Sequence, residues 1–162
     1  METESRTEEA ADPGRAFSIL VADDDRGSRD ALAGLLADRG FHTVTAASGE
    51  EAIEIVHVEM IHLVFFDMHM PRMTGLEALQ QVRLINALLP AILVTADATR
   101  DLIREAFQAQ VFSVIPKPVN KNIVLHTLAR ALHRVYGDDP PPTPPDARPG
   151  PPPVPYPGEP SR

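Results

Sequence analysis

Cysteine is absent from the 162-residue sequence. Its absence excludes a disulfide scaffold, cysteine-ligated zinc, iron–sulfur clusters and thiol catalysis. No stretch approaches the roughly 18 consecutive apolar residues of a membrane-spanning helix, so none is expected. The acidic and polar segment from Met1 to Arg15 lacks the apolar run of a signal peptide. We therefore expect a soluble, cytoplasmic protein.

Basic side chains are scarce relative to acidic ones, since 15 Lys and Arg stand against 23 Asp and Glu. The resulting net charge of −8 disfavours binding to a polyanion, so no direct DNA binding is expected. Apolar residues make up 43% of the chain, which is enough to form a real core. The length allows one domain of ordinary size with tails.

Proline is distributed unevenly, with 12 of the 17 prolines between Pro140 and Pro160. Proline at this density supports neither helix nor sheet, so residues 137–162 are predicted to be a disordered, polyproline II-like tail. Residues 1–16 carry five acids and have almost nothing to bury, so they are predicted to be a disordered N-terminal lead. The segment 17–136 is the predicted folded domain.

Short apolar runs alternate with helical patterns along this segment. Five strand-then-helix units in about 120 residues predict an α/β domain with a parallel sheet. Right-handed crossovers place helices on both faces of such a sheet, and a ligand binds beyond the carboxyl ends of its strands. Capping boxes at Ser48–Glu51 and Thr74–Glu77 predict the starts of two helices. The predicted strands cover residues 17–23, 42–46, 61–67, 90–95 and 111–115.

Polar side chains stand at the ends of four predicted strands. The first strand ends in Asp23 and Asp24, the third in Asp67 and the fourth in Thr95, and Lys117 follows the fifth. Clustered carboxylates repel one another unless a cation joins them, and hard oxygen ligands suit Mg²⁺. The formal charges of three carboxylates, one lysine and one Mg²⁺ sum to zero, so the site is balanced only with the metal.

Such a balanced site can accept a phosphoryl group. An aspartate can itself be the nucleophile in phosphoryl transfer and form an acyl phosphate. The metal and Lys117 would neutralise the charge that develops on the transferred oxygens, and the Thr95 hydroxyl would donate a hydrogen bond to one of them. Taken alone, the acidic run at residues 23–25 would instead indicate a solvated turn that caps a helix.

Segment 17–136 resembles the receiver domain of two-component response regulators. The resemblance rests on ILVADDD (19–25), FFDMHMPRMTG (65–75), ILVTAD (92–97) and PKP (116–118), with Arg29 six residues after Asp23. These motifs occur in the family's order with suitable spacings. The resemblance implies a flavodoxin-like fold, in which a doubly wound, five-stranded parallel sheet of order 2-1-3-4-5 carries helices on both faces.

The resemblance also implies a metal site. Transferred by position, it makes Asp67 the phosphoacceptor and Asp24 the direct Mg²⁺ ligand. Asp23 then acts mostly through water, and the backbone carbonyl of His69 is a further ligand. The cofactor that the resemblance implies is therefore Mg²⁺, with Asp67 also belonging to the metal site.

Three further positions match the family's pattern. Thr95 resembles the switch hydroxyl that follows the phosphoryl group, and Lys117 resembles the lysine that pairs with it. Lys117-Pro118 is the family's usual cis peptide. Gly75 lies where the family relaxes its backbone at the start of a helix.

One position departs from that pattern. The family usually has Tyr or Phe three residues before the lysine, and here that residue is Val114. Valine is stiff and small, so it cannot reproduce the inward and outward switch of a ring. Phe112 is predicted to lie on the same face of the strand two residues earlier, although it is not the equivalent position.

The resemblance implies a stand-alone response regulator that takes a phosphoryl group from a sensor histidine kinase or a phosphotransfer protein. It would catalyse only its own phosphorylation and dephosphorylation. The proline-rich residues 137–162 hold no output domain, so output is expected through protein–protein contact with an unknown target. The contact surface implied by the family comprises the fourth helix, fifth strand and fifth helix.

Three alternatives remain open. The chain could be an intermediate in a phosphorelay, or a binding module that works without phosphorylation, for which Val114 is the support. It could also be an aspartyl-phosphate hydrolase of the haloacid dehalogenase type. That chemistry requires a second acid two residues after the nucleophile, where this sequence has His69.

Overall fold

Strands and helices alternate throughout residues 17–138, the part of the chain that the computed structural model describes. The predicted lead 1–16, and all but the first two residues of the predicted tail, lie outside the described residues. No helix within 17–138 combines the length and apolar character needed to span a membrane. In chain order the elements are β1 (Ser18–Ala22), α2 (Arg26–Ala37), β2 (His42–Ala46), α3 (Gly49–Val58), β3 (Leu63–Asp67), α4 (Gly75–Ile85), β4 (Ala91–Thr95), α5 (Arg100–Gln108), β5 (Ser113–Pro116) and α6 (Lys121–Tyr136).

The five strands form one parallel sheet in the order β2-β1-β3-β4-β5, which confirms the predicted flavodoxin-like topology. The register aligns the carboxyl ends of the strands. Ala22 of β1 pairs with Phe66 of β3, Asp67 pairs with Val94 of β4, and Thr95 pairs with Pro116 of β5. The residues that end or follow these strands therefore lie along one edge of the sheet.

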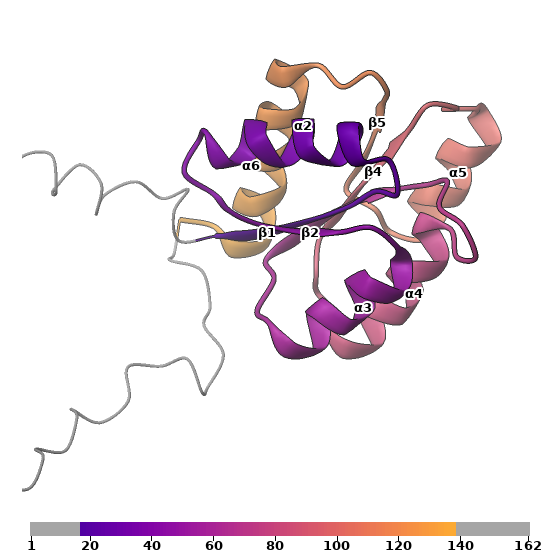
Figure 1. Cartoon of the computed structure of the whole chain (residues 1–162), viewed down its shortest axis with the longest axis horizontal. Coiled ribbons are helices and arrows are strands. Elements are labelled where there is room, and N and C mark those ends of the chain that lie inside the picture. The colour runs from indigo at the N-terminus through magenta and orange to yellow at the C-terminus, as the bar shows by residue number, and fades with distance from the viewer. Residues whose placement is uncertain (1–16, 139–162) are drawn as a thin grey trace, which may run out of the picture.

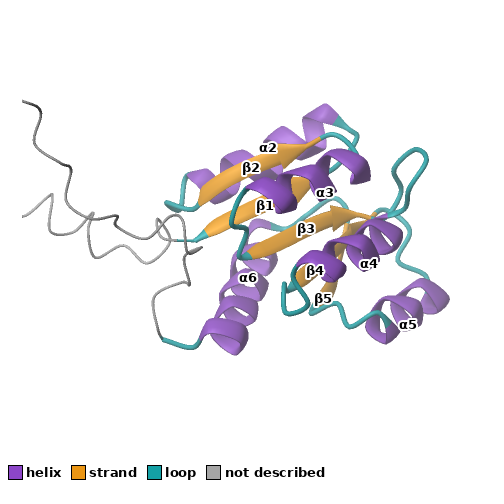
Figure 2. Cartoon of the chain, turned by 90° about the horizontal axis from the view of Figure 1, so that it is seen from below, coloured by secondary structure: helices purple, strands orange, loops and turns teal. Residues whose placement is uncertain are grey.

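Helices cover both faces of the sheet, as Figures 1 and 2 show. Side chains of α2 and α6 pack with alternate strand residues such as Ile19, Phe65 and Ile92 on one face. Side chains of α3, α4 and α5 pack with the intervening residues, such as Leu20 and Phe66, on the other. Because both faces are covered, every residue of β3 and β4 is buried. This explains why the sequence of each strand is an almost continuous apolar run.

Side-chain caps begin the helices, largely as predicted. Thr74 and Glu77 form a complete capping box at α4, in which each side chain accepts from the other's backbone N–H. At α3, Ser48 accepts from the N–H of Glu51 as expected. The reciprocal half of that box was predicted wrongly, because the Glu51 carboxylate accepts from the N–H of Ala47 instead.

The prediction that Phe112 shares a strand face with Val114 was wrong. Strand β5 begins at Ser113, so the alternation of side chains does not extend back to Phe112. Val114 packs against the cluster beneath α3, α4 and α5, whereas Phe112 packs against the cluster beneath α2 and α6. The guanidinium carbons of Arg130 and Arg134 lie 5.6 and 6.0 Å from the centre of the Phe112 ring. Phe112 therefore does not occupy the space beside Val114.

Candidate functional site

Three carboxylates meet at the carboxyl edge of the sheet. Asp23 and Asp24 follow β1, and Asp67 is the last residue of the neighbouring strand β3. Each offers an oxygen that lies within 4.8 Å of the others'. Asp23 and Asp67 are buried, with 5% and 7% of their surface exposed, while Asp24 is exposed. The fold thus brings together the acids predicted for the site and leaves one of them open to solvent.

Lys117 lies between the two buried acids. Its Nζ donates to Oδ2 of Asp23 at 2.9 Å and lies 3.3 Å from Oδ1 of Asp67. The backbone N–H of Lys117 donates to the carbonyl of Thr95, which fixes the loop after β5 to the end of β4. The Lys117-Pro118 peptide is cis, as the resemblance implies. One ammonium group therefore serves two carboxylates.

Burial, and to a lesser extent the negative charge of Asp23, raise the pKa of Asp67 to about 6. Lys117 opposes the rise but does not cancel it. Near neutral pH Asp67 is therefore mostly ionised, but at a cost in free energy, because Lys117 does not fully offset its burial and the charge of Asp23. A raised carboxyl pKa in a charged cluster is typical of a functional site.

The pKa of Asp23 moves the other way. Its burial favours the neutral acid, but hydrogen bonds from Lys117, the backbone N–H of Asp25 and Ser28 outweigh this effect and lower the pKa. For Lys117, burial disfavours the charged amine, yet the hydrogen bond to Asp23 and the charges of both acids raise its pKa. Asp23 and Lys117 thus form an ion pair, and Asp67 is the carboxylate without a full partner.

The residues fit a divalent cation. Three carboxylates and one ammonium leave a net charge of −2, and the negative charge of Asp23 adds to burial in raising the pKa of Asp67. Oxygen donors with one side open to solvent are the ligands that Mg²⁺ prefers. The cluster is consistent with the Mg²⁺ site of receiver domains.

Two other predicted residues flank this cluster without touching it. Thr95 is fully buried, and its Oγ1 accepts from the backbone N–H of Asp97 at 3.1 Å. The carbonyl of His69 accepts no hydrogen bond from any residue within 17–138, so its lone pairs remain available as a ligand. The structure therefore places both near the cluster's edge of the sheet but shows neither in contact with Asp67.

Gly75 has a different structural role from the one expected. The φ angle of Gly75 is not in the positive range, so its backbone does not need glycine's freedom. A Cβ here would lie 2.5 Å from the carbonyl oxygen of Asp67, and the N–H of Gly75 donates to the carbonyl of Met68 at 2.9 Å. Glycine is required because α4 begins directly against the end of β3.

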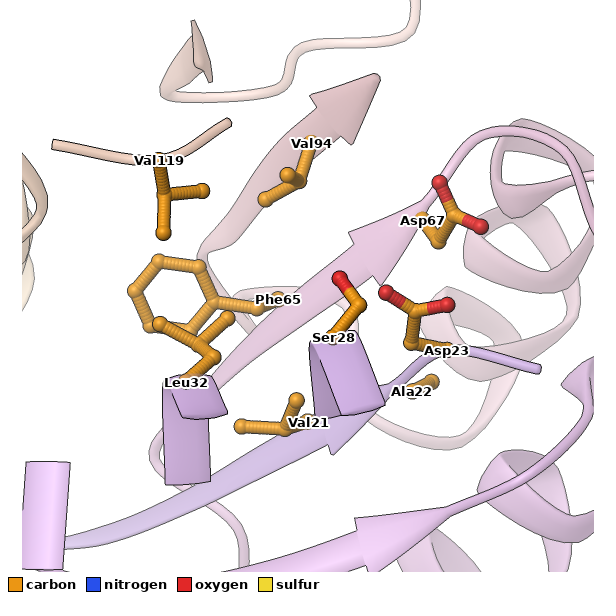
Figure 3. Close-up of a pocket in the computed structure, with 9 residues that line it drawn as sticks. All are labelled: Val21, Ala22, Asp23, Ser28, Leu32, Phe65, Asp67, Val94 and Val119. Carbon is orange, nitrogen blue, oxygen red and sulfur yellow. The ribbon is translucent and has the colours of Figure 1, made fainter. Parts of the chain in front are cut away.

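Two residues of the site were not assigned a role from the sequence. Arg29 was marked only by its spacing from Asp23, and its Nη1 donates to the backbone carbonyl of Asp23 at 2.8 Å. Ser28 contributes a hydrogen bond to Asp23 and lines a small hollow beside Asp23 and Asp67, between α2 and Val119 (Figure 3). The spacing of Arg29 from Asp23 was a usable signal, whereas nothing in the sequence marked Ser28.

The sequence matches the family described as the response regulator receiver domain over residues 19–129. The chain is 36% identical over 124 residues to the chemotaxis protein CheY of Pseudomonas aeruginosa, covering 75% of this chain and 100% of that protein. It is 32% identical over 129 residues to the sensor histidine kinase RcsC of Salmonella typhimurium, where it covers 80% of this chain but only 14% of the kinase.

Solved structures agree with this assignment. The CheY-like receiver domain protein of Methanospirillum hungatei matches with a TM-score of 0.72 and 26% identity, covering 76% of this chain and 98% of that one. A chain of the structure described as the CheX-CheY-BeF3-Mg²⁺ complex from Borrelia burgdorferi matches with a TM-score of 0.66 and 26% identity. The match covers 70% of this chain and 87% of that one. Since the family match spans most of the chain and its fold and acidic pocket agree, this chain belongs to the response regulator receiver domain family.

Proposed function

We propose that this chain is a stand-alone response regulator that accepts a phosphoryl group on Asp67 from the phosphohistidine of a sensor kinase or phosphotransfer protein. The observation that carries the proposal is the pairing of Lys117 with both Asp23 and Asp67 inside a three-carboxylate cluster. Coverage of the whole of a CheY supports the stand-alone role, and the Mg²⁺ in the complex of the related Borrelia burgdorferi CheY supports the metal.

In the proposed reaction, a carboxylate oxygen of Asp67 attacks the phosphorus of the donor. The P–N bond breaks as the P–O bond forms, and the leaving imidazole takes up a proton from water. The Lys117 ammonium, 3.3 Å from Oδ1 of Asp67, is placed to neutralise charge on the transferred oxygens. Thr95 would donate its hydroxyl hydrogen to one of these oxygens, because in its present contact that hydroxyl only accepts, from the N–H of Asp97, and its own hydrogen is not used there.

We propose that the metal is held by Asp23, Asp24, Asp67 and the carbonyl of His69. When bound, Mg²⁺ would supply the positive charge that the cluster lacks and so keep Asp67 ionised as a nucleophile. Asp24 is the exposed member, which leaves the metal a path from solvent. Asp23 is already paired with Lys117, so its contact with the metal through water is the arrangement that disturbs the ion pair least.

Output by protein–protein contact is the second half of the proposal. Its surface would be formed by α5, β5 and α6. Val114 stands at the edge strand β5, where it is partly buried against the cluster that includes α5 residues. A valine offers no ring to swing between two positions, so a shift of the β4–α5 loop with Thr95 would carry the signal.

The test is intact mass after incubation with acetyl phosphate, with and without Mg²⁺. The wild type should gain one phosphoryl group only with Mg²⁺, and Asp67→Asn should gain none. Asp38→Asn, which makes the same change at the exposed end of α2, should behave like the wild type. A wild type that neither gains mass nor binds Mg²⁺ would favour a binding module that works without phosphorylation. Mg²⁺ binding without mass gain would point to a donor that must be a protein.

A further inference from the structure

The loop between β3 and α4, residues 68–74, carries the His69 carbonyl. Both ends of this loop are fixed: the N–H of Met68 donates to Val94 at 3.0 Å, and the N–H of Gly75 donates to Met68 at 2.9 Å. The side chains of Met68 and Met70 are buried in the core beneath α3 and α4. The loop is therefore well anchored up to Met70, and His69 lies between two buried residues.

The tip of the loop is different. Arg72 has a φ of +69°, in the left-handed region that residues with a side chain adopt uncommonly. The N–H of Met73 donates to the carbonyl of Pro71 at 2.7 Å and closes a three-residue turn around Arg72. A three-residue turn with positive φ at its centre is the rare and strained form. Such a conformation persists only where neighbouring interactions hold it.

The side chain of Met73 packs against the core cluster and the N–H of Thr74 donates to Glu77, while one ion pair holds Arg72 itself. Nε of Arg72 donates to Oε2 of Glu50, in the first turn of α3, at 2.9 Å. This hydrogen bond lowers the pKa of Glu50, so the pair stays ionised at neutral pH. The backbone N–H of Glu50 also lowers the pKa of this carboxylate, and its side chain is 44% exposed, so the pair lies at the surface. Within residues 17–138, loop 68–74 makes no other ion pair.

We propose that Arg72 and Glu50 form a positioning clamp for the metal site. The clamp holds the strained turn at Arg72 and so keeps loop 68–74 in the conformation in which the His69 carbonyl accepts no hydrogen bond from residues 17–138 and could serve as the proposed ligand. Neither residue is catalytic, because neither reaches the carboxylates of the cluster. The inference rests on the proposed function, since it assigns the pair an effect on Mg²⁺ binding.

A purely structural role makes a different prediction. An exposed ion pair that only stabilises the surface would change the melting temperature and leave Mg²⁺ affinity unaltered. A clamp changes Mg²⁺ affinity, because a loop that leaves its bound-state conformation must be reordered when the metal binds. The decisive readout is therefore the dissociation constant of Mg²⁺, with thermal melting recorded alongside.

The experiment titrates the full-length chain with MgCl2 by calorimetry. Glu50→Gln and Arg72→Ala should each weaken Mg²⁺ binding measurably, by up to about fivefold, the upper end of what an exposed ion pair contributes. Arg72→Gly should lose less Mg²⁺ affinity than Arg72→Ala, because glycine adopts the positive φ without strain. The combined variant Glu50→Gln/Arg72→Ala should bind Mg²⁺ no more weakly than either single variant, since both remove the same interaction.

Two controls decide between outcomes. Arg104→Ala removes another exposed pair, to Asp101, and should leave Mg²⁺ binding unchanged. The charge-reversed variant Glu50→Arg/Arg72→Glu should recover affinity relative to either single reversal. Equal Mg²⁺ affinity in wild type, Glu50→Gln and Arg72→Ala would overturn the clamp. A combined variant whose loss of Mg²⁺ affinity equals the sum of the two single losses would also overturn it. A wild type that binds no Mg²⁺ would overturn both the clamp and the proposed function, and that result is read from the wild type alone.

Discussion

The buried polar groups at the two ends of the sheet differ in how fully other groups in the protein compensate them. At the amino end, His62 is 4% exposed and satisfied: its Nδ1 accepts from the N–H of Ser18 at 2.9 Å, and its carbonyl accepts from the Tyr136 hydroxyl at 2.7 Å. The imidazole packs against Phe17 and Tyr136 with ring centres 5.4 and 5.6 Å apart. Hydrogen bonds and ring contacts thus join the starts of β1 and β3 to the last helix.

At the carboxyl end, Asp23 and Asp67 share one ammonium, and burial with the charge of Asp23 raises the pKa of Asp67 to about 6. Loop 68–74, beside this site, holds a residue with positive φ. Strain and unneutralised charge both reduce stability. The unneutralised charge lies where a cation and a phosphoryl group would bind, and the strained turn lies in the loop that follows Asp67. The comparison therefore separates a stabilising end of the sheet from a reactive end.

The largest expected effect comes from Gly75→Ala. The added methyl would lie 2.5 Å from the backbone oxygen of Asp67, so α4 or the end of β3 must shift. We expect a loss of about 3 kcal/mol in the free energy of unfolding. A displacement near 1 Å should also slow phosphorylation from acetyl phosphate about a hundredfold. Urea unfolding and the rate of mass gain measure the two effects.

Gly34→Ala is the matched control for that change. Gly34 is exposed within α2, and a Cβ there would meet nothing within 4 Å. Alanine should stabilise the helix by up to about 1 kcal/mol and leave phosphorylation unaltered. If Gly75→Ala were as harmless as Gly34→Ala, the close approach of α4 to Asp67 would not constrain the site.

A smaller effect is expected from the pH dependence of stability in Asp67→Asn. The pKa of Asp67 in the folded chain is about 6, above its ordinary value of 3.8, so the folded protein holds this proton more tightly. The free energy of unfolding of the wild type should therefore fall as pH rises from about 4 to 7, by roughly 2 kcal/mol relative to the variant. The loss should be complete above pH 7.

Chemical unfolding of both proteins at pH 4, 5, 6 and 7.5 measures this difference. Subtracting the variant removes the contribution of the histidines, which both proteins share. Saturating Mg²⁺ should abolish the difference, because a bound cation favours the ionised carboxylate. If the free energies of unfolding of wild type and Asp67→Asn changed equally with pH in the absence of Mg²⁺, the pKa of Asp67 would not be raised in the folded chain.

The sheet and the membership of the acidic cluster could be predicted from the sequence for one physical reason. Parallel strands covered on both faces give continuous apolar runs, and their carboxyl ends must meet at one edge. Placing Asp23, Asp24, Asp67 and Lys117 at those ends was therefore enough to bring them together. The prediction needed the order of elements but no side-chain conformation.

Features that depend on exact packing were not predictable in the same way. The start of β5 decided which face Phe112 would occupy: the strand was predicted to begin at residue 111 but begins at Ser113, so Phe112 lies outside it. The reason for Gly75 was the distance to a neighbouring backbone oxygen rather than a backbone angle. The contact between Arg72 and Glu50 joins residues 22 positions apart on a loop and a helix, and no local pattern marks it.

The smallest expected effect comes from a variant at the amino end of the sheet, which tests whether the two ends act independently. Tyr136→Phe removes the hydroxyl that donates to the His62 carbonyl but keeps the ring against Phe17 and His62. Burial raises the pKa of Tyr136 to about 12, so the hydroxyl is a neutral donor throughout the working range. The variant should lose about 1 kcal/mol in the free energy of unfolding measured in urea, because one partly buried hydrogen bond is removed. Mg²⁺ affinity and the rate of phosphorylation should both stay at wild-type values. A change in either would mean that the two ends of the sheet are coupled, and the division between a stabilising end and a reactive end would fail.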